Sequence, residues 1–164
     1  MIRKLSIADF QAIYVIINDA SFAYKGKIPS DCYKEPYMPQ HELRAEMESG
    51  VQFFGITQNG DLAAVMGIQP VGDVTLIRHA YTLTRFQRQG LGEKLLNYLL
   101  GLAETERVLV GTWESAPWAI GFYQKHGFVL LSREETNKLL HKYWNIPERQ
   151  VETSVVLEQK RRRR

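Results

Sequence analysis

Apolar residues recur along the chain with two different periods, which predicts a succession of helices and strands. Residues 5–23 carry apolar side chains at near-helical spacing, and Ser6 and Asp9 suit the start of that helix. Residues 41–49 predict a short second helix that ends at a glycine. Residues 25–40 hold prolines and aromatic residues, which predicts an irregular loop whose rings pack on the core or meet a ligand.

Strands are predicted where β-branched and aromatic residues gather. Residues 51–57 and 62–70 read as two strands joined by Asn59-Gly60, which is a strong hairpin signal. Residues 74–84 predict a third strand after a turn at Gly72-Asp73. We expect these strands to be antiparallel and to lead directly into a helix-forming turn.

Predicted strands and helices continue to alternate in the second half of the chain. Residues 107–113 form a near-continuous apolar run, as expected for a strand that lies under helices and pairs in parallel. Ser115 and Pro117 mark a helix start, and Gly127 marks a helix stop. Residues 128–131 predict another strand.

The C-terminal part predicts a helix over residues 134–144, a break at Pro147 and a last strand over 152–157. Neither an internal repeat nor a second domain is apparent, so one domain is expected over residues 1–159. Residues 160–164 are a lysine and four arginines, which is typical of a solvated, disordered tail.

Residues 85–92, Arg-Phe-Gln-Arg-Gln-Gly-Leu-Gly, join the third strand to a helix with leucines on one face. A strand that turns sharply into a helix leaves the first helical N–H groups without partners. Those donors, the positive end of the helix dipole and Arg88 predict an anion site that suits a phosphate. Gly90 and Gly92 let the backbone approach the phosphates because they carry no Cβ.

Two familiar phosphate-binding turns do not fit this stretch. A P-loop needs Gly-Lys-Ser/Thr, whereas Gly92 is followed by Glu93-Lys94-Leu95. A Rossmann turn needs Gly or Ala where Leu95 stands, although Glu114 lies at about the spacing of the carboxylate that binds the ribose.

The stretch Gln87-Arg88-Gln89-Gly90-Leu91-Gly92 resembles the Gln/Arg-x-x-Gly-x-Gly/Ala signature of the GNAT superfamily, the acetyl-CoA-dependent N-acetyltransferases. Ala119-Ile-Gly-Phe-Tyr-Gln-Lys-His-Gly-Phe128 is similar to the later Ala-x-x-Phe-Tyr-x-x-x-Gly-Phe helix of that family. The two motifs occur in the family's order, and the resemblance covers roughly residues 62–131. It implies a single-domain α/β (α+β) fold, with a mixed central sheet of about six to seven strands flanked by about four helices.

The resemblance also implies that acetyl-CoA is the cofactor. The implied cofactor-binding residues are Thr82, Leu83, Gln87, Arg88, Gln89, Gly90, Leu91, Gly92 and Ala116. Backbone N–H groups near Thr82 and Leu83 are expected to face the thioester oxygen. Ala116 departs from the family, which often has an asparagine that contacts CoA at this position. No metal is implied.

Acetyl transfer to an amine requires a neutral amine, and deprotonating a lysine-like amine at pH 7 costs about 4–5 kcal/mol. The resemblance implies that Tyr123 is the general acid for the departing thiolate. Leu76 and Arg78 occupy the positions where family members carry a side-chain base. His79 lies one residue away and turns to the opposite face unless a bulge shifts the register. Glu114 is the alternative base.

The acceptor site is expected to have aromatic walls. The candidate residues are Tyr33, Tyr37, Trp113 and Trp144, for which packing on the core is the other interpretation. The resulting hypothesis is direct transfer of an acetyl group to a primary amine of a small molecule or a peptide. The alternative is a protein of the same fold that binds acetyl-CoA as a sensor or regulator without turnover.

Composition adds limits to these hypotheses. With 45% hydrophobic and 24% charged residues, the chain is typical of a soluble globular protein, and no apolar run predicts a membrane span or signal peptide. The single cysteine, Cys32, suits a reducing cytoplasm. The net charge of +3 becomes negative without the residues at 160–164, so nucleic-acid binding is disfavoured. A homodimer is compatible with these features.

Overall fold

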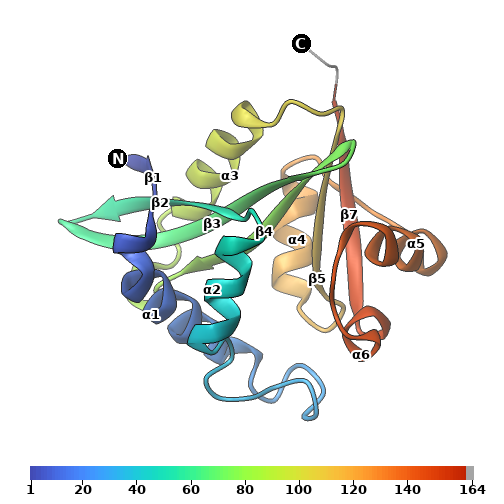
Figure 1. Ribbon diagram of the computed structural model, residues 1–164, viewed down its shortest axis with the longest axis horizontal. Coiled ribbons are helices and arrows are strands. Elements are labelled where there is room, and N and C mark those ends of the chain that lie inside the picture. The colour runs from blue at the N-terminus through green and yellow to red at the C-terminus, as the bar shows by residue number, and fades with distance from the viewer. Residues whose placement is uncertain (162–164) are drawn as a thin grey trace. The chain divides into compact units, whose positions relative to one another are not determined.

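The computed structural model describes residues 1–161, which divide into two compact units. The first unit comprises residues 1–23, 34–69 and 77–103, and the second comprises residues 24–33, 70–76 and those from 104 onward. The strands form a seven-stranded sheet in the order β1-β2-β3-β4-β5-β7-β6 (Figure 1). The α/β fold class predicted from the sequence is confirmed, and the single domain over residues 1–159 stays a prediction.

The first unit holds the N-terminal helices and strands. Its helical elements are the 3₁₀ turn Ile7–Asp9, α1 (Phe10–Ala20), α2 (Gln40–Glu48), the 3₁₀ turn Thr84–Phe86 and α3 (Leu91–Leu102). Its strands are β1 (Ile2–Lys4), β2 (Gln52–Gln58), most of β3 (Asp61–Val71) and the second part of β4 (Val74–Thr82). The strand β1, which pairs antiparallel with β2, was not predicted from the sequence.

Local sequence signals in this unit act as predicted. Ser6 and Asp9 form a capping box at the start of the first helical segment. Asn59 and Gly60 have φ of 54° and 84°, as the tight hairpin between β2 and β3 requires. Gly50, with φ of 107°, follows the C-cap of α2.

Two neighbouring phenylalanines of β2 show how the helices cover the sheet in the first unit. Phe53 is buried in a cluster with Ile13 of α1 and Leu43 of α2. Phe54 packs on Tyr98 of α3, with ring centroids 5.7 Å apart. Because successive strand residues point to opposite faces, α1 and α2 cover one face of β2 and α3 covers the other (Figure 1).

The second unit contains the C-terminal half. Its elements are the 3₁₀ turn Ser21–Tyr24 in part, β5 (Arg107–Trp113), α4 (Pro117–Lys125), β6 (Val129–Leu130), α5 (Arg133–Tyr143), α6 (Glu148–Glu152) and β7 (Ser154–Lys160). The strand β7 pairs antiparallel with β5 and with β6 (Figure 1). Leu109 of β5, Leu140 of α5 and Val156 of β7 share its buried cluster.

Two details of the second unit and the total number of helices differ from the prediction. The N-cap of α4 is Ala116 rather than Ser115, whose buried Oγ has no hydrogen-bond partner in the described part of the chain. The predicted break at Pro147 is present, but this proline is also the N-cap of α6, a helix that was not predicted. With α6 included, residues 1–161 hold six α-helices, where about four were expected.

The predicted tail begins inside the sheet. Lys160 ends β7, and the N–H of Arg161 donates to the carbonyl of Glu106 at 2.8 Å. Residues 162–164 of the predicted tail lie outside the described residues. Among residues 1–161, no helix is long and apolar enough to span a membrane.

Candidate functional site

The turn between β4 and α3 is anchored to the first unit at its start. The Asp19 carboxylate accepts a hydrogen bond from the N–H of Thr84 at 2.8 Å and one from its hydroxyl at 3.0 Å. Later in the same turn, Arg88 and Gly90 have positive φ, of 64° and 77°. These left-handed residues reverse the chain direction just before α3 begins.

The N-terminus of α3 has no side-chain cap. Gly90 is the N-cap residue, and its carbonyl accepts the N–H of Lys94 at 3.1 Å, which is the first helical bond. The N–H groups of Leu91, Gly92 and Glu93 therefore precede the hydrogen-bonded ladder. A Cβ on Gly90 would meet no atom within 4 Å, so the N-cap residue itself borders open space. This end of α3 can hold a phosphate group.

The predicted cofactor-binding side chains of this turn divide into two groups. Gln87 donates from Nε2 to the Thr82 carbonyl at 3.2 Å, and Gln89 accepts from Gln58 Nε2 at 2.9 Å. These two side chains brace the turn, whereas that of Arg88 is exposed. The side chain of Leu91 is buried in the core, so only its backbone faces the helix end.

The expected role of Leu83 as a backbone donor is not supported. Its N–H donates to the carbonyl of Ala63 on β3 at 2.8 Å, so this amide is already satisfied inside the first unit. The prediction for Leu83 is therefore wrong for its N–H group. The prediction for Thr82 stays a prediction.

Tyr123 lies in α4 of the second unit and is almost completely buried. Its ring makes edge-on contacts with Phe122 and Phe128, with centroids 5.1 and 5.5 Å apart. Burial raises the pKa of the Tyr123 hydroxyl well above its ordinary value, and the charge of Tyr24 adds to this effect. Tyr123 therefore keeps its proton throughout the neutral range.

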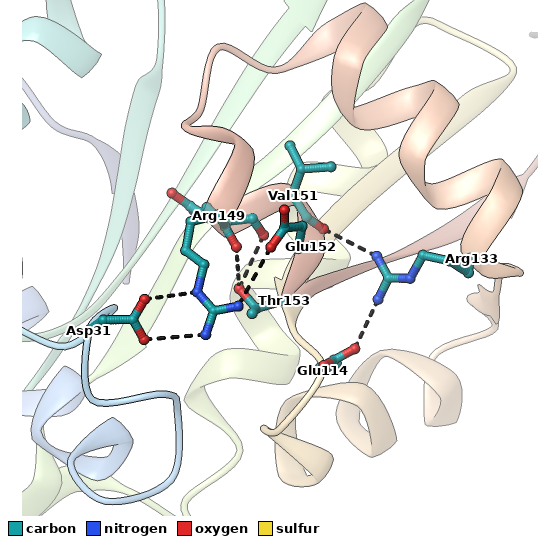
Figure 2. A network of polar contacts seen from close by, with 8 residues as sticks. Asp31, Glu114, Arg133, Arg149, Val151, Glu152 and Thr153 are labelled. Carbon is teal, nitrogen blue, oxygen red and sulfur yellow. Dashed lines mark hydrogen bonds and ion pairs between the residues drawn. The ribbon is translucent and has the colours of Figure 1, made fainter.

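Glu114 follows β5 and is held by an arginine, as Figure 2 shows. Its Oε2 lies 2.9 Å from Nη2 of Arg133, which also donates from Nη1 to the Val151 carbonyl at 3.1 Å. The N–H of Glu114 donates to the Thr153 carbonyl at 2.9 Å. The Glu114 carboxylate is therefore engaged by the guanidinium of Arg133.

His79 lies where β4 is irregular. Its φ of 53° is left-handed, which is rare for a residue other than glycine. The ring stacks on Phe53 with centroids 5.9 Å apart, and Nε2 is 3.5 Å from Oε2 of Glu46. The side chain of His79 was expected to change faces of the sheet only if β4 is irregular there. The left-handed φ shows that β4 is irregular at this residue.

The predicted aromatic and cofactor residues outside the turn lie in different places. Trp113 is buried at the end of β5, and Ala116 is buried at the start of α4. Trp144 packs on β5, where a Cβ on Gly111 would lie 3.4 Å from its Cζ2. Tyr33 and Tyr37 are half-buried in the loop before α2. An acceptor pocket formed by these aromatics stays a prediction.

The sequence analysis missed Glu46, Arg133 and Arg149 as members of polar clusters. Arg149 of α6 donates from Nε and Nη2 to Oδ2 and Oδ1 of Asp31 at 2.8 and 3.2 Å, as Figure 2 shows. Only the fold brings these partners together, and no sequence spacing identified them. Within residues 1–161, no cluster of three or more His, Cys, Asp or Glu can hold a metal ion.

Comparison with known families assigns most of the chain. The model of the acetyltransferase (GNAT) domain matches residues 18–141. This match includes the uncapped turn at Gly90 and the helix with Tyr123.

Solved structures share the fold at low sequence identity. The PaiA N-acetyltransferase of Thermoplasma acidophilum, crystallised with coenzyme A, has a TM-score of 0.72 and 14% identity, and the match covers 98% of both chains. The ribosomal-protein-S18-alanine N-acetyltransferase of Escherichia coli has a TM-score of 0.69 and 21% identity over 98% of this chain and 92% of that one. A GNAT-family acetyltransferase of Staphylococcus aureus Mu50 has a TM-score of 0.72 and 16% identity over 99% of both.

Proposed function

The chain belongs to the GNAT acetyltransferase family, whose cofactor is acetyl-CoA, and we propose that it acetylates a primary amine of a small molecule or a peptide. The observation that carries this proposal is the uncapped N-terminus of α3 behind the left-handed Gly90. Three backbone donors at the positive end of a helix dipole, next to an N-cap residue that borders open space, suit the diphosphate of CoA. Arg88, exposed in the same turn, adds a positive charge.

The bound thioester supplies an activated acetyl group, and the chain's own residues supply proton transfer. Tyr123 serves as the general acid that protonates the departing thiolate, because its hydroxyl stays protonated at neutral pH. An acceptor amine must also lose a proton before it attacks. His79 is a better candidate for that step than Glu114, since Arg133 occupies the Glu114 carboxylate.

The acceptor panel should contain both small and peptide amines. One structural neighbour is named for acetylating an alanine of ribosomal protein S18, so an N-terminal alanine peptide belongs beside free polyamines and amino acids. Release of free thiol from acetyl-CoA, measured in the presence of each amine, identifies an acceptor.

Tyr123→Phe tests the proposed general acid. We expect kcat to fall by about 10²- to 10⁴-fold while CoA affinity stays close to wild type, because only the donated proton is lost. Tyr98→Phe is the matched control, since Tyr98 packs on Phe54 in the first unit and has no proposed role in proton transfer. Equal kcat values for the wild type and Tyr123→Phe would refute the acid role.

A regulatory protein without turnover is the second candidate. Its support is that the alternative base Glu114 forms an ion pair and is not free. This candidate function predicts that the melting temperature rises with the concentration of acetyl-CoA, while no amine on the panel releases thiol.

A further inference from the structure

A carboxylate from α2 reaches the irregular part of β4. Glu46 is held by Arg78, whose Nη1 and Nη2 lie 2.9 and 3.4 Å from the two carboxylate oxygens. Gln69 of β3 accepts from the same guanidinium at 3.3 Å. The side chains of Arg78 and Glu46 are only 14% and 24% exposed, so water screens this pair weakly. The arginine fork fixes the orientation of the carboxylate.

The Glu46 carboxylate points its Oε2 at His79. The 3.5 Å distance to Nε2 is longer than a hydrogen bond, and among residues 1–161 this buried nitrogen has no other hydrogen-bond partner. The imidazole is fixed from its face by Phe53 and from its backbone by the left-handed φ of 53°. A small approach of the two side chains closes the bond, and catalytic hydrogen bonds are often long before substrate binds.

Burial and the surrounding charges keep His79 neutral and Glu46 ionised at pH 7. Burial lowers the pKa of His79 below its ordinary value; Glu46 opposes that effect, and the positive charge of Arg78 adds to it. Burial alone raises the pKa of Glu46, but His79 and Arg78 together bring it below its ordinary value. At pH 7 the pair is therefore a neutral imidazole beside a carboxylate. Burial lowers the pKa of Arg78, and the charges of Glu46 and Tyr81 oppose that effect.

We propose that His79 accepts the proton of the acceptor ammonium and that Glu46 is its positioning residue. This inference rests on the proposed acetyl transfer. Glu46 accepts a hydrogen bond from Nε2–H of the neutral ring, which leaves the lone pair on Nδ1. The ammonium N–H bond breaks as the Nδ1–H bond forms, giving a neutral amine and an imidazolium. The negative charge of Glu46 stabilises that imidazolium, which later returns its proton to solvent.

The test compares Glu46→Gln with Glu48→Gln, which removes a carboxylate from the exposed end of the same helix. With acetyl-CoA and an accepted amine, Glu46→Gln is expected to lower kcat by about tenfold or more. It is also expected to move the acid limb of the pH profile to lower pH, because the carboxylate that favours the imidazolium is gone. Glu48→Gln is expected to leave both quantities unchanged.

A second measurement does not depend on turnover. Imidazole nitrogen shifts followed by NMR report the protonation of His79 directly, and His79→Asn assigns its signals. Asn tolerates a left-handed φ, so this variant is expected to fold. In Glu46→Gln the His79 midpoint is expected to move to lower pH, whereas in Glu48→Gln it is expected to stay.

The outcomes separate the two levels of the hypothesis. An inactive wild type across the amine panel refutes the proposed function and the catalytic role with it, whatever the NMR titration gives. An active wild type whose acid limb and kcat are the same in Glu46→Gln overturns this inference alone, and a lowered melting temperature would then identify a structural ion pair. An unshifted His79 midpoint in Glu46→Gln also overturns it.

Discussion

The carbonyl oxygen of Arg78 on β4 lies so close to Gly67 on β3 that a Cβ at position 67 would sit 3.0 Å from it. The same Cβ would lie 2.8 Å from Cγ1 of Val51. A backbone carbonyl in a sheet cannot rotate away as a side chain can. The two strands therefore approach this closely because residue 67 has no side chain, and the contact lies one residue before the left-handed His79.

Gly67→Ala is expected to destabilise the protein by about 1–3 kcal/mol, because the added methyl group forces the backbone of β3 and β4 apart. Urea unfolding measures this change. The matched control is Gly101→Ala in α3, where a Cβ meets no atom within 4 Å and helix propensity favours Ala by about 0.5–1 kcal/mol. Gly67→Ala with wild-type stability would contradict the close approach.

Gly90→Glu is expected to weaken CoA binding at least about tenfold, equivalent to about 1.4 kcal/mol, measured by titration calorimetry. A side chain has room at position 90, because a Cβ there would meet no atom within 4 Å, and its negative charge at the N-cap of α3 would repel a diphosphate bound at the first helical turn. Gly90→Asn is the control for backbone strain, because Asn accepts the φ of 77° with little cost. If Gly90→Glu binds CoA like the wild type, the anion site is not at this turn.

His79 is expected to make the free energy of unfolding decrease at acidic pH. Its folded-state pKa is lowered by burial, so the unfolded chain binds more protons as the pH drops below about 6.5. Stability is therefore complete above that pH and is lost as the pH falls toward the folded-state pKa. Urea unfolding at a series of pH values should show this slope in the wild type and in His41→Asn but a smaller slope in His79→Asn. Equal slopes in all three proteins would contradict the burial of a neutral imidazole.

Asp31→Asn is expected to speed hydrogen exchange in the loop segment 24–33 with little change in global stability. Arg149 holds this loop through a two-pronged pair, but both side chains are exposed, so the pair adds little to overall folding. Arg149→Lys should give an intermediate rate, because it keeps the charge and loses the planar fork. Asp61→Asn, which removes another exposed ion pair, serves as the control. Unchanged exchange in Asp31→Asn would show that other contacts hold the loop.

The sequence predicted those elements whose signals are local. The strand at Arg107–Trp113 has the predicted bounds, because a continuous apolar run can only be satisfied under helices. Gly90 was singled out because a strand-to-helix turn with open donors needs backbone without a Cβ, and its positive φ agrees with that reason. The sequence did predict the break at Pro147, but it missed the short helix α6, for which Pro147 is the N-cap residue.

Chemistry that depends on partners was decided by the tertiary structure. The amide of Leu83 is satisfied by Ala63, and the carboxylate of Glu114 is held by Arg133, although both looked available in the sequence. Glu46 meets His79 only because α2 packs beside the irregular part of β4. Periodicity and glycine placement act through the local backbone, so the sequence alone determined most of the strands and the left-handed turn at Gly90. Hydrogen bonds and ion pairs between distant residues depend on which side chains the fold brings within about 3 Å, so only the folded chain decided which groups are free to act.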